Sequence, residues 1–238
     1  MRERNAALHA RALALFAKAP RPGEVKTRLI PVLGAEAAAK IAAAFVADSG
    51  ENVVQAARRV NAVPFLFCAP PAAIDTMRAF VSNEMMIRPQ SVGNLGTRLI
   101  AAHTTLIAEG FRDVCFVGAD SPTMPRPYVD RAFLALDDGY DLALGPADDG
   151  GYYLIALRAL HRSLFENIDW STSRVYEQTV LHAQRLGLSF HALPTWYDVD
   201  DAASLSRLRR ELCDRTLADG EGLAPRTRAL LSSLGLLS

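Results

Sequence analysis

The four apolar residues at 114–117 constrain the fold of this chain more than any other segment. Neighbouring side chains of a strand point to opposite faces, so a strand that is apolar throughout needs cover on both faces. That pattern is typical of a central strand with helices on each side of the sheet. The other predicted strands are residues 13–17, 63–68, 141–144, 152–157 and 189–193. Of these, residues 152–157 are the candidate for an antiparallel strand.

Segments with helical spacing separate these strands. The clearest is the Ala-rich stretch that begins at residue 35, whose pattern continues towards residue 59. The other helix candidates are residues 74–81, 95–109, 125–136, 171–186 and 202–212. Alternating strands and helices predict a single three-layer α/β/α domain with a mostly parallel sheet over residues 12–212. We expect residues 1–11 to form a flexible N-terminus and residues 213–238 a helical C-terminal tail.

Composition excludes several classes of protein. Lys and Arg together number 26, as do Asp and Glu, so the formal net charge is zero; proteins that coat nucleic acid or membrane surfaces normally carry a basic excess. No stretch has the roughly 18 apolar residues of a membrane span, and the first eleven residues lack the apolar core of a signal peptide. Three widely spaced cysteines favour a reducing compartment. We therefore expect a cytoplasmic protein without nucleic-acid or membrane partners, of open oligomeric state.

The loop after the first strand is strongly basic. Ligands of open parallel sheets bind beyond the carboxyl ends of the strands, and clustered cations there suit a phosphate or diphosphate group. A Walker P-loop is excluded, because Val25 stands where that motif needs glycine. The sequence is equally consistent with a solvent-exposed basic loop that binds no ligand. The four cations of the loop are Lys18, Arg21, Lys26 and Arg28.

Asp120 follows the apolar run at 114–117 after only two small residues. A carboxylate in this position is a good ligand for a hard cation such as Mg²⁺ or Mn²⁺. The alternative is that Asp120 caps the helix that begins near Pro125. The sequence alone slightly favours the ligand role.

A second acidic segment follows the strand at 141–144. Asp148 and Asp149 precede Gly150 and Gly151, and such glycines allow a ligand to approach the backbone closely. An ordinary Asp-Gly turn between strands explains the same residues equally well.

Two further segments carry weaker signals. The carboxylates at 198–201 either complete a metal shell or cap the last helix, and the local sequence favours the cap. The glycines at 93 and 96 do not form a GxGxxG fingerprint, so binding of NAD or FAD is unsupported. The five histidines show no zinc-binding spacing.

Taken in order, these segments resemble a bacterial family of GT-A-fold, nucleotide-diphospho-sugar transferase enzymes, the arsenosugar-biosynthesis or selenium-domain-associated glycosyltransferases. The resemblance covers residues 12–212. Its most specific pieces are residues 18–29, 118–122, 145–153, Trp170-Ser171-Thr172 and Asp198-Val199-Asp200.

The resemblance implies a role for each segment. The basic loop would bind the nucleotide's phosphates, and Gln90 with the stretch that contains Gly96 would form the base-recognition loop. Asp120 and Asp200 would hold Mg²⁺ or Mn²⁺, with Asp120 also in the catalytic set. Asp149 would meet the sugar or the acceptor and serve as the general base. The neighbouring substrate-binding residues would be Asp148, Gly150 and Gly151.

The chain departs from the family's pattern at three places. Asn94 stands where an acidic residue is more frequent, and Asp201 where related enzymes often carry Thr. Asp120 also lacks a second acid two residues away, so its metal shell needs ligands from another segment.

The resemblance implies metal-dependent transfer of a sugar from a nucleotide-diphospho-sugar to a small-molecule acceptor. The alternative with the same fold is a nucleotidyltransferase, which uses a nucleoside triphosphate and a phosphorylated small molecule. A Pro-rich first loop with the single glycine Gly23 favours sugar transfer. A non-catalytic nucleotide-binding protein is the third possibility, disfavoured by the set of carboxylates.

Overall fold

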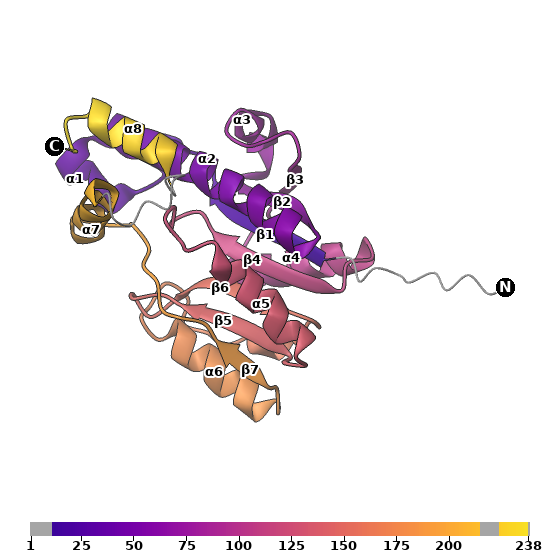
Figure 1. The fold of residues 1–238 in the computed structure, drawn as a ribbon. Coiled ribbons are helices and arrows are strands. Elements are labelled where there is room, and N and C mark those ends of the chain that lie inside the picture. Colours follow the sequence, from indigo (N-terminus) through magenta and orange to yellow (C-terminus); the bar gives the residue numbers. More distant parts are fainter. Residues whose placement is uncertain (1–10, 215–223, 238) are drawn as a thin grey trace.

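The apolar run at 114–117 forms the middle of a seven-stranded sheet in the computed structural model, which describes residues 11–214 and 224–237 (Figure 1). It belongs to β4 (Asp113–Gly118), the fourth strand across. β1 (Arg11–Lys18) pairs with β4 in parallel on one side, and β6 (Tyr152–Leu157) pairs with it antiparallel on the other. Residues 114–117 are at most 3% exposed, as expected for a strand covered on both faces.

The strand order is β3-β2-β1-β4-β6-β5-β7, and β6 is the strand that runs against its neighbours. The prediction of a mostly parallel sheet with an antiparallel strand at 152–157 is therefore confirmed. β3 was not predicted, because its four residues include a charge and a proline and lie at the sheet edge. The remaining strands are β2 (Ala62–Ala69), β3 (Met86–Pro89), β5 (Leu142–Pro146) and β7 (Phe190–Ala192).

Helices cover both faces, which confirms the three-layer α/β/α domain. α2 (Ala35–Val60), α3 (Ile74–Arg78) and α5 (Pro127–Asp137) share one apolar core with the sheet. α4 (Leu95–Ala108) and α6 (Val175–Arg185) share the core on the opposite face. Each face of a strand thus contributes alternate side chains to a different core.

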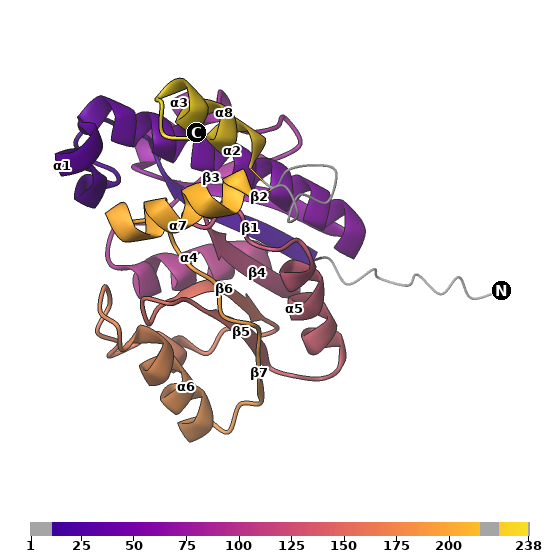
Figure 2. The ribbon, with the colours of Figure 1, turned by 60° about the vertical axis from the view of Figure 1, so that its left-hand side comes forward.

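A third core lies beyond the carboxyl ends of β1 and β4. It joins the first half of α2 to α1 (Ile30–Leu33), α7 (Ala202–Cys213) and α8 (Pro225–Ser233). Figure 2 shows α8 lying along α2. The buried carboxylate of Asp48 on α2 accepts hydrogen bonds from the backbone N–H groups of Arg226 and Thr227, at the first turn of α8. The helical C-terminal tail therefore packs on the domain.

The ends of several predicted segments differ in the structure; for example, the helix predicted over residues 74–81 ends at Arg78. The helix predicted over residues 171–186 begins at Val175, because Ser171 has a left-handed φ of 66° and Arg174 at the N-cap supplies no side-chain cap. The strand expected from Leu13 begins at Arg11, so most of the predicted flexible N-terminus, residues 1–10, lies outside the described residues.

Among the residues that the structure describes, no helix is both long enough and apolar enough to span a membrane.

Candidate active site

A cavity of about 420 Å³ opens where β1 and β4 end. Parallel strands place their carboxyl ends at one edge, so segments distant in sequence meet there. Polar side chains from four segments line it: Lys18 and Lys26 from the first loop, Gln90 and Arg98, Asp120, and Asp198 with Asp200. Tyr152 and Tyr153 at the start of β6 form another part of the wall.

Lys26 holds together the two carboxylates predicted as metal ligands. Its Nζ donates to Oδ1 of Asp200 at 2.9 Å and forms a short contact with Oδ1 of Asp120. The Lys26 side chain is only 4% exposed and lies over the ring of Phe45, with Nζ 5.1 Å from the centroid. Burial alone would lower the pKa of Lys26, but Asp120 and Asp200 outweigh it, and the pKa is raised. The ammonium therefore stays charged between the two acids.

Asp120 does not cap the following helix, since the N-cap of α5 is Arg126 and has no side-chain cap bond. Instead the backbone C=O of Asp120 accepts a hydrogen bond from Val199 N–H at 2.9 Å. This bond ties the segment after β4 to the acidic segment before α7, which brings Asp120 and Asp200 to one place.

Asp198 was predicted only as one of the carboxylates at 198–201, with no separate role, and it lies within this site. Its Oδ1 accepts a 2.5 Å hydrogen bond from the hydroxyl of Ser121. Burial, with a smaller contribution from the charges of Asp120, Asp149 and Asp200, raises the pKa of Asp198 to about 7 against the opposing effect of the Ser121 hydrogen bond. The position of residues 198–201 directly before the last helix indicates an acidic segment near the site. It does not indicate which of these carboxylates faces the first cavity.

The structure separates the four cations predicted to bind phosphate. Lys18 and Lys26 line the cavity. Arg21 does not line it, and its guanidinium lies 3.9 Å from the carboxylate of Glu24 with nearly half of its side chain exposed. Arg28 lines a neighbouring cavity instead. The third cation of the first cavity is Arg98, which sequence reasoning missed because it lies in a helix rather than in the basic loop.

Gln90 uses its side-chain amide to hold backbone and Arg98 in place. Its Nε2 donates to the carbonyls of Ala17 and Phe67 at 3.2 and 2.8 Å. Its Oε1 accepts from Nη1 of Arg98 at 3.3 Å, so Gln90 positions this guanidinium at the cavity.

The start of α4 explains two other predicted positions. A Cβ at Gly96 would lie 2.6 Å from the Trp170 ring and 2.9 Å from the Phe165 carbonyl, so this glycine allows the helix to pack closely on the segment that contains Trp170. Asn94 is the N-cap of α4 and accepts from the N–H of Thr97 at 2.9 Å. Gly96 is absent from the lining of the first cavity, and its visible role here is packing.

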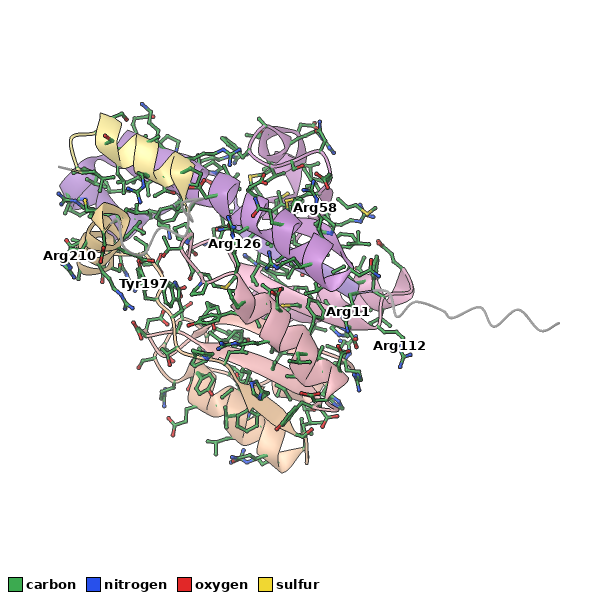
Figure 3. All side chains as sticks on the ribbon, in the orientation of Figure 1. Arg11, Arg58, Arg112, Arg126, Tyr197 and Arg210 are labelled. Carbon is green, nitrogen blue, oxygen red and sulfur yellow. The ribbon has the colours of Figure 1, made fainter. Side chains whose placement is uncertain are left out.

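A second cavity, of about 390 Å³, adjoins the first. Asp198 and Asp200 line both cavities and thus form the wall between them. The second cavity lies beside α7, where Figure 3 shows Tyr197 and Arg210. The other residues that line it are Arg28, Asp148, Asp149, Asp201, Ala203, Ser204 and Arg207.

A turn fixes the two carboxylates that follow β5 at the second cavity. Asp148 pairs with Arg207, and Oδ1 of Asp149 accepts from the N–H of Gly151 at 2.8 Å. Gly150 has a φ of 87°, and a Cβ there would lie 2.0 Å from the Ser173 carbonyl oxygen. The predicted Asp-Gly turn is therefore present. Its glycines allow the turn, and the turn places Asp148 and Asp149 at the second cavity.

The acidic segment at 198–201 divides between the two roles proposed for it. Asp201 is the N-cap of α7 and forms a capping box with Ser204, with Oδ1 accepting from Ser204 N–H at 2.9 Å. Asp198 and Asp200 face the shared wall of the cavities instead.

The oxygen donors of Asp120 and Asp200 suit Mg²⁺ or Mn²⁺. Within residues 11–214 and 224–237, no group of three or more His, Cys, Asp or Glu side chains is arranged to hold a metal ion. Mg²⁺ is commonly held by one or two carboxylates together with substrate phosphates rather than by protein ligands alone. Asp120 and Asp200 fit the arrangement in which two carboxylates and substrate phosphates hold the ion together.

Solved structures share this fold over nearly the whole chain. A candidate nucleotide-diphospho-sugar transferase from Desulfovibrio desulfuricans G20 is 32% identical, with a TM-score of 0.83 over 94% of this chain and 95% of that one. A cytidylyltransferase from Leptospira borgpetersenii serovar Hardjo-bovis (strain JB197) is 12% identical, with a TM-score of 0.56 over 95% of this chain and 96% of that one.

A third structure, 4-diphosphocytidyl-2C-methyl-D-erythritol synthase from Anaerococcus prevotii DSM 20548, is 9% identical, with a TM-score of 0.52 over 83% of this chain and 96% of that one. The last two similarities concern the fold alone. No curated protein matches the sequence. A family model described as "uncharacterized protein conserved in bacteria (DUF2064)" matches residues 52–172. The chain therefore belongs to this bacterial DUF2064 family and has the fold of the nucleotide-diphospho-sugar transferases.

Proposed function

We propose that the protein is a glycosyltransferase that moves a sugar from a nucleotide-diphospho-sugar to a small-molecule acceptor. The first cavity would take the nucleotide sugar and the second the acceptor. The observation that carries this proposal is the shared wall: Asp198 and Asp200 face both cavities, so two ligands would meet there. The similarity to the D. desulfuricans protein supports the choice of donor.

The cations of the first cavity suit the leaving group. In the transfer, the acceptor oxygen forms a bond to the anomeric carbon, and the bond from that carbon to the diphosphate oxygen breaks. The nucleoside diphosphate leaves with the electron pair. Lys18, Lys26 and Arg98 line the cavity that would hold it, and their charges would stabilise the negative charge that develops there.

Asp149 would accept the proton of the acceptor hydroxyl. It lines only the second of the two cavities, the one assigned to the acceptor. Its Oδ1 is bonded to the Gly151 N–H, while its Oδ2 has no hydrogen bond within the described part of the chain, which leaves this oxygen for a proton. A positioned carboxylate commonly contributes 10²- to 10⁴-fold, roughly, as a general base.

Asp120 and Asp200 would hold Mg²⁺ or Mn²⁺ together with the donor's phosphates. The metal, when bound, would offset charge on the leaving diphosphate. Lys26 contacts the same two carboxylates, so it keeps them together before a metal is bound.

The narrower placement among arsenosugar- or selenium-associated enzymes rests on the order of the sequence motifs. Cytoplasmic location is supported by Cys68, Cys115 and Cys213, which form no disulfide.

The experiment that tests the proposal compares donors and products. The protein is incubated with nucleotide sugars or with nucleoside triphosphates, with and without Mg²⁺ or Mn²⁺. Sugar transfer releases a nucleoside diphosphate, whereas nucleotidyl transfer releases pyrophosphate from a triphosphate. Pyrophosphate release would assign the same site to the alternative reaction. Asp120→Ala with unchanged nucleotide affinity and metal response would support a non-catalytic binding protein instead.

A further inference from the structure

We infer that the molecule bound in the second cavity carries an anionic group, a carboxylate or a phosphate, that Arg28 and Arg210 recognise. This inference rests on the proposed function where it calls that molecule the acceptor. The assignment of the charge itself rests on the second cavity alone.

The lining of the second cavity contains side chains of both charges. Asp198 and Asp200 lie on the wall shared with the first cavity. Arg28, from the short helix η1 (Thr27–Leu29), and Arg210, from the last turn of α7, line the second cavity but not the first. Asp148, Asp149 and Asp201 line the second cavity as well, and Asp148 pairs with Arg207. A ligand therefore meets carboxylates on several sides, and the anionic group would lie at Arg28 and Arg210.

The arginines differ in how they are bonded. The Arg207 guanidinium already contacts two other side chains: it pairs with Asp148 and lies 3.8 Å from the centroid of the Tyr197 ring. In contrast, the guanidinium groups of Arg28 and Arg210 form no hydrogen bond or ion pair with any residue of the described chain, although five aspartates line the same cavity. Both guanidinium groups thus have their full set of donors available.

This arrangement would orient a ligand as well as bind it. Guanidinium groups match the paired oxygens of carboxylates and phosphates, whereas the aspartates of this cavity repel an anion. A molecule with an anionic group at one end and a hydroxyl at the other would place the anion on the arginines. Its hydroxyl would then lie near Asp149 and the shared wall. The ligand class is therefore a hydroxy acid or a phosphate ester of a polyol.

Three probes with the same three-carbon skeleton test this inference: glycerol 3-phosphate, glycerate and glycerol. Each is titrated calorimetrically into the protein, both alone and with a saturating nucleoside diphosphate that occupies the first cavity. We expect at least one anionic probe to bind and glycerol not to bind. The double variant Arg28→Gln/Arg210→Gln should weaken anionic-probe binding by about tenfold or more, because it removes charge-assisted hydrogen bonds.

Arg185→Gln is the matched control, because Arg185 also lies in the last turn of a helix but lines neither cavity. It should leave probe binding unchanged. Tighter binding of glycerol 3-phosphate would indicate a phosphate, and tighter binding of glycerate a carboxylate.

Three results would overturn the inference. The first is that neither anionic probe binds the wild-type protein up to about 20 mM, a concentration that detects even very weak affinity. The second is that glycerol binds as well as the anionic probes. The third is that binding is lost in Lys26→Gln and retained in the double arginine variant, which would place the anion in the first cavity. Failure of the proposed function would show differently: no nucleoside diphosphate would bind, while arginine-dependent binding of the anionic probe alone would persist.

Discussion

The Nζ of Lys26 lies 2.9 Å from Oδ1 of Asp200, a residue 174 positions later in the chain, and the same ammonium contacts Asp120. We predict that Lys26→Gln weakens binding of a nucleoside diphosphate by about tenfold or more, since a charge that faces the phosphates is lost. Calorimetry measures this change. Lys40→Gln, an exposed position on α2, is the control and should bind like the wild type. Equal affinity of the two variants would remove Lys26 from the nucleotide site.

Lys26 also shows what the sequence could and could not predict. The strands and most helices follow from local apolar patterns, and the carboxyl ends of β1 and β4 follow from the α/β arrangement, so the place of the site was predictable. The division of the basic loop was not: Lys26 turns into the first cavity, while Arg28, two residues later, turns to the second. Lys26 has a left-handed φ of 47°, and a backbone turn of this kind is not evident from residue types alone.

Asp198 and Arg98 show a second limit. Both line the first cavity through tertiary contacts, Asp198 beside Ser121 and Arg98 beside Gln90. Side-chain contacts of this kind, across 77 residues for Asp198 and across a loop for Arg98, leave no periodic signal in a single sequence. Local patterns therefore indicated which segments form the site, but not which side chains of each segment face inward.

Asp149→Asn should lower kcat by roughly 10²-fold or more while KM for the acceptor changes little, because the amide keeps the hydrogen bond from Gly151 but cannot accept a proton. Steady-state kinetics with the donor found by the product assay measures both constants. Asp138→Asn, at the exposed end of α5, serves as the control for the loss of one negative charge. An unchanged kcat in Asp149→Asn would exclude Asp149 as the base.

Gly96→Ala should destabilise the protein by about 1–3 kcal/mol, because a Cβ at this position would overlap the Trp170 ring and the Phe165 carbonyl. Urea unfolding measures the change. Gly118→Ala is the matched control, since a Cβ there would meet no atom within 4 Å and the backbone is not in the left-handed region. A Gly96→Ala protein of normal stability but reduced nucleotide affinity would instead support the role expected from the sequence.

His103 should make stability depend on pH. The residue is fully buried and neither ring nitrogen has a hydrogen-bond partner in the described chain. Burial, with a smaller contribution from His161, lowers the pKa of His103 to about 4. The unfolded chain then binds more protons than the folded one between pH 6.5 and pH 4, so stability falls as the pH falls through this window.

The size of this effect follows from the shift in pKa. The lowered pKa of His103 reduces stability by about 3.5 kcal/mol at most, from roughly 1.4 kcal/mol per pKa unit. His103→Leu should remove this part of the pH dependence, and urea unfolding of both proteins at several pH values measures the difference. A difference between them that stays constant from pH 7 to pH 4 would show that His103 does not contribute.

Asp48 should control how firmly α8 packs on α2. Its buried carboxylate accepts from the N–H groups of Arg226 and Thr227 at 3.1 and 2.7 Å. Asp48→Ala removes both acceptors and should cost about 1–2 kcal/mol, as loss of a helix N-cap does.

Asp48→Asn separates the hydrogen bonds of Asp48 from its charge. The variant keeps one acceptor oxygen and avoids a buried charge. Burial raises the pKa of Asp48 despite its hydrogen bonds to Thr227 and Arg226. Keeping Asp48 charged in the folded state therefore lowers the free energy of unfolding once the pH exceeds the ordinary pKa of an aspartate. Asp48→Asn should therefore be milder than Asp48→Ala at pH 7. Hydrogen exchange of the α8 amides measures this difference directly: protection lost in Asp48→Ala and retained in Asp48→Asn would mean that the hydrogen bonds, rather than the negative charge, hold the helix. Equal loss in both variants would assign that role to the charge.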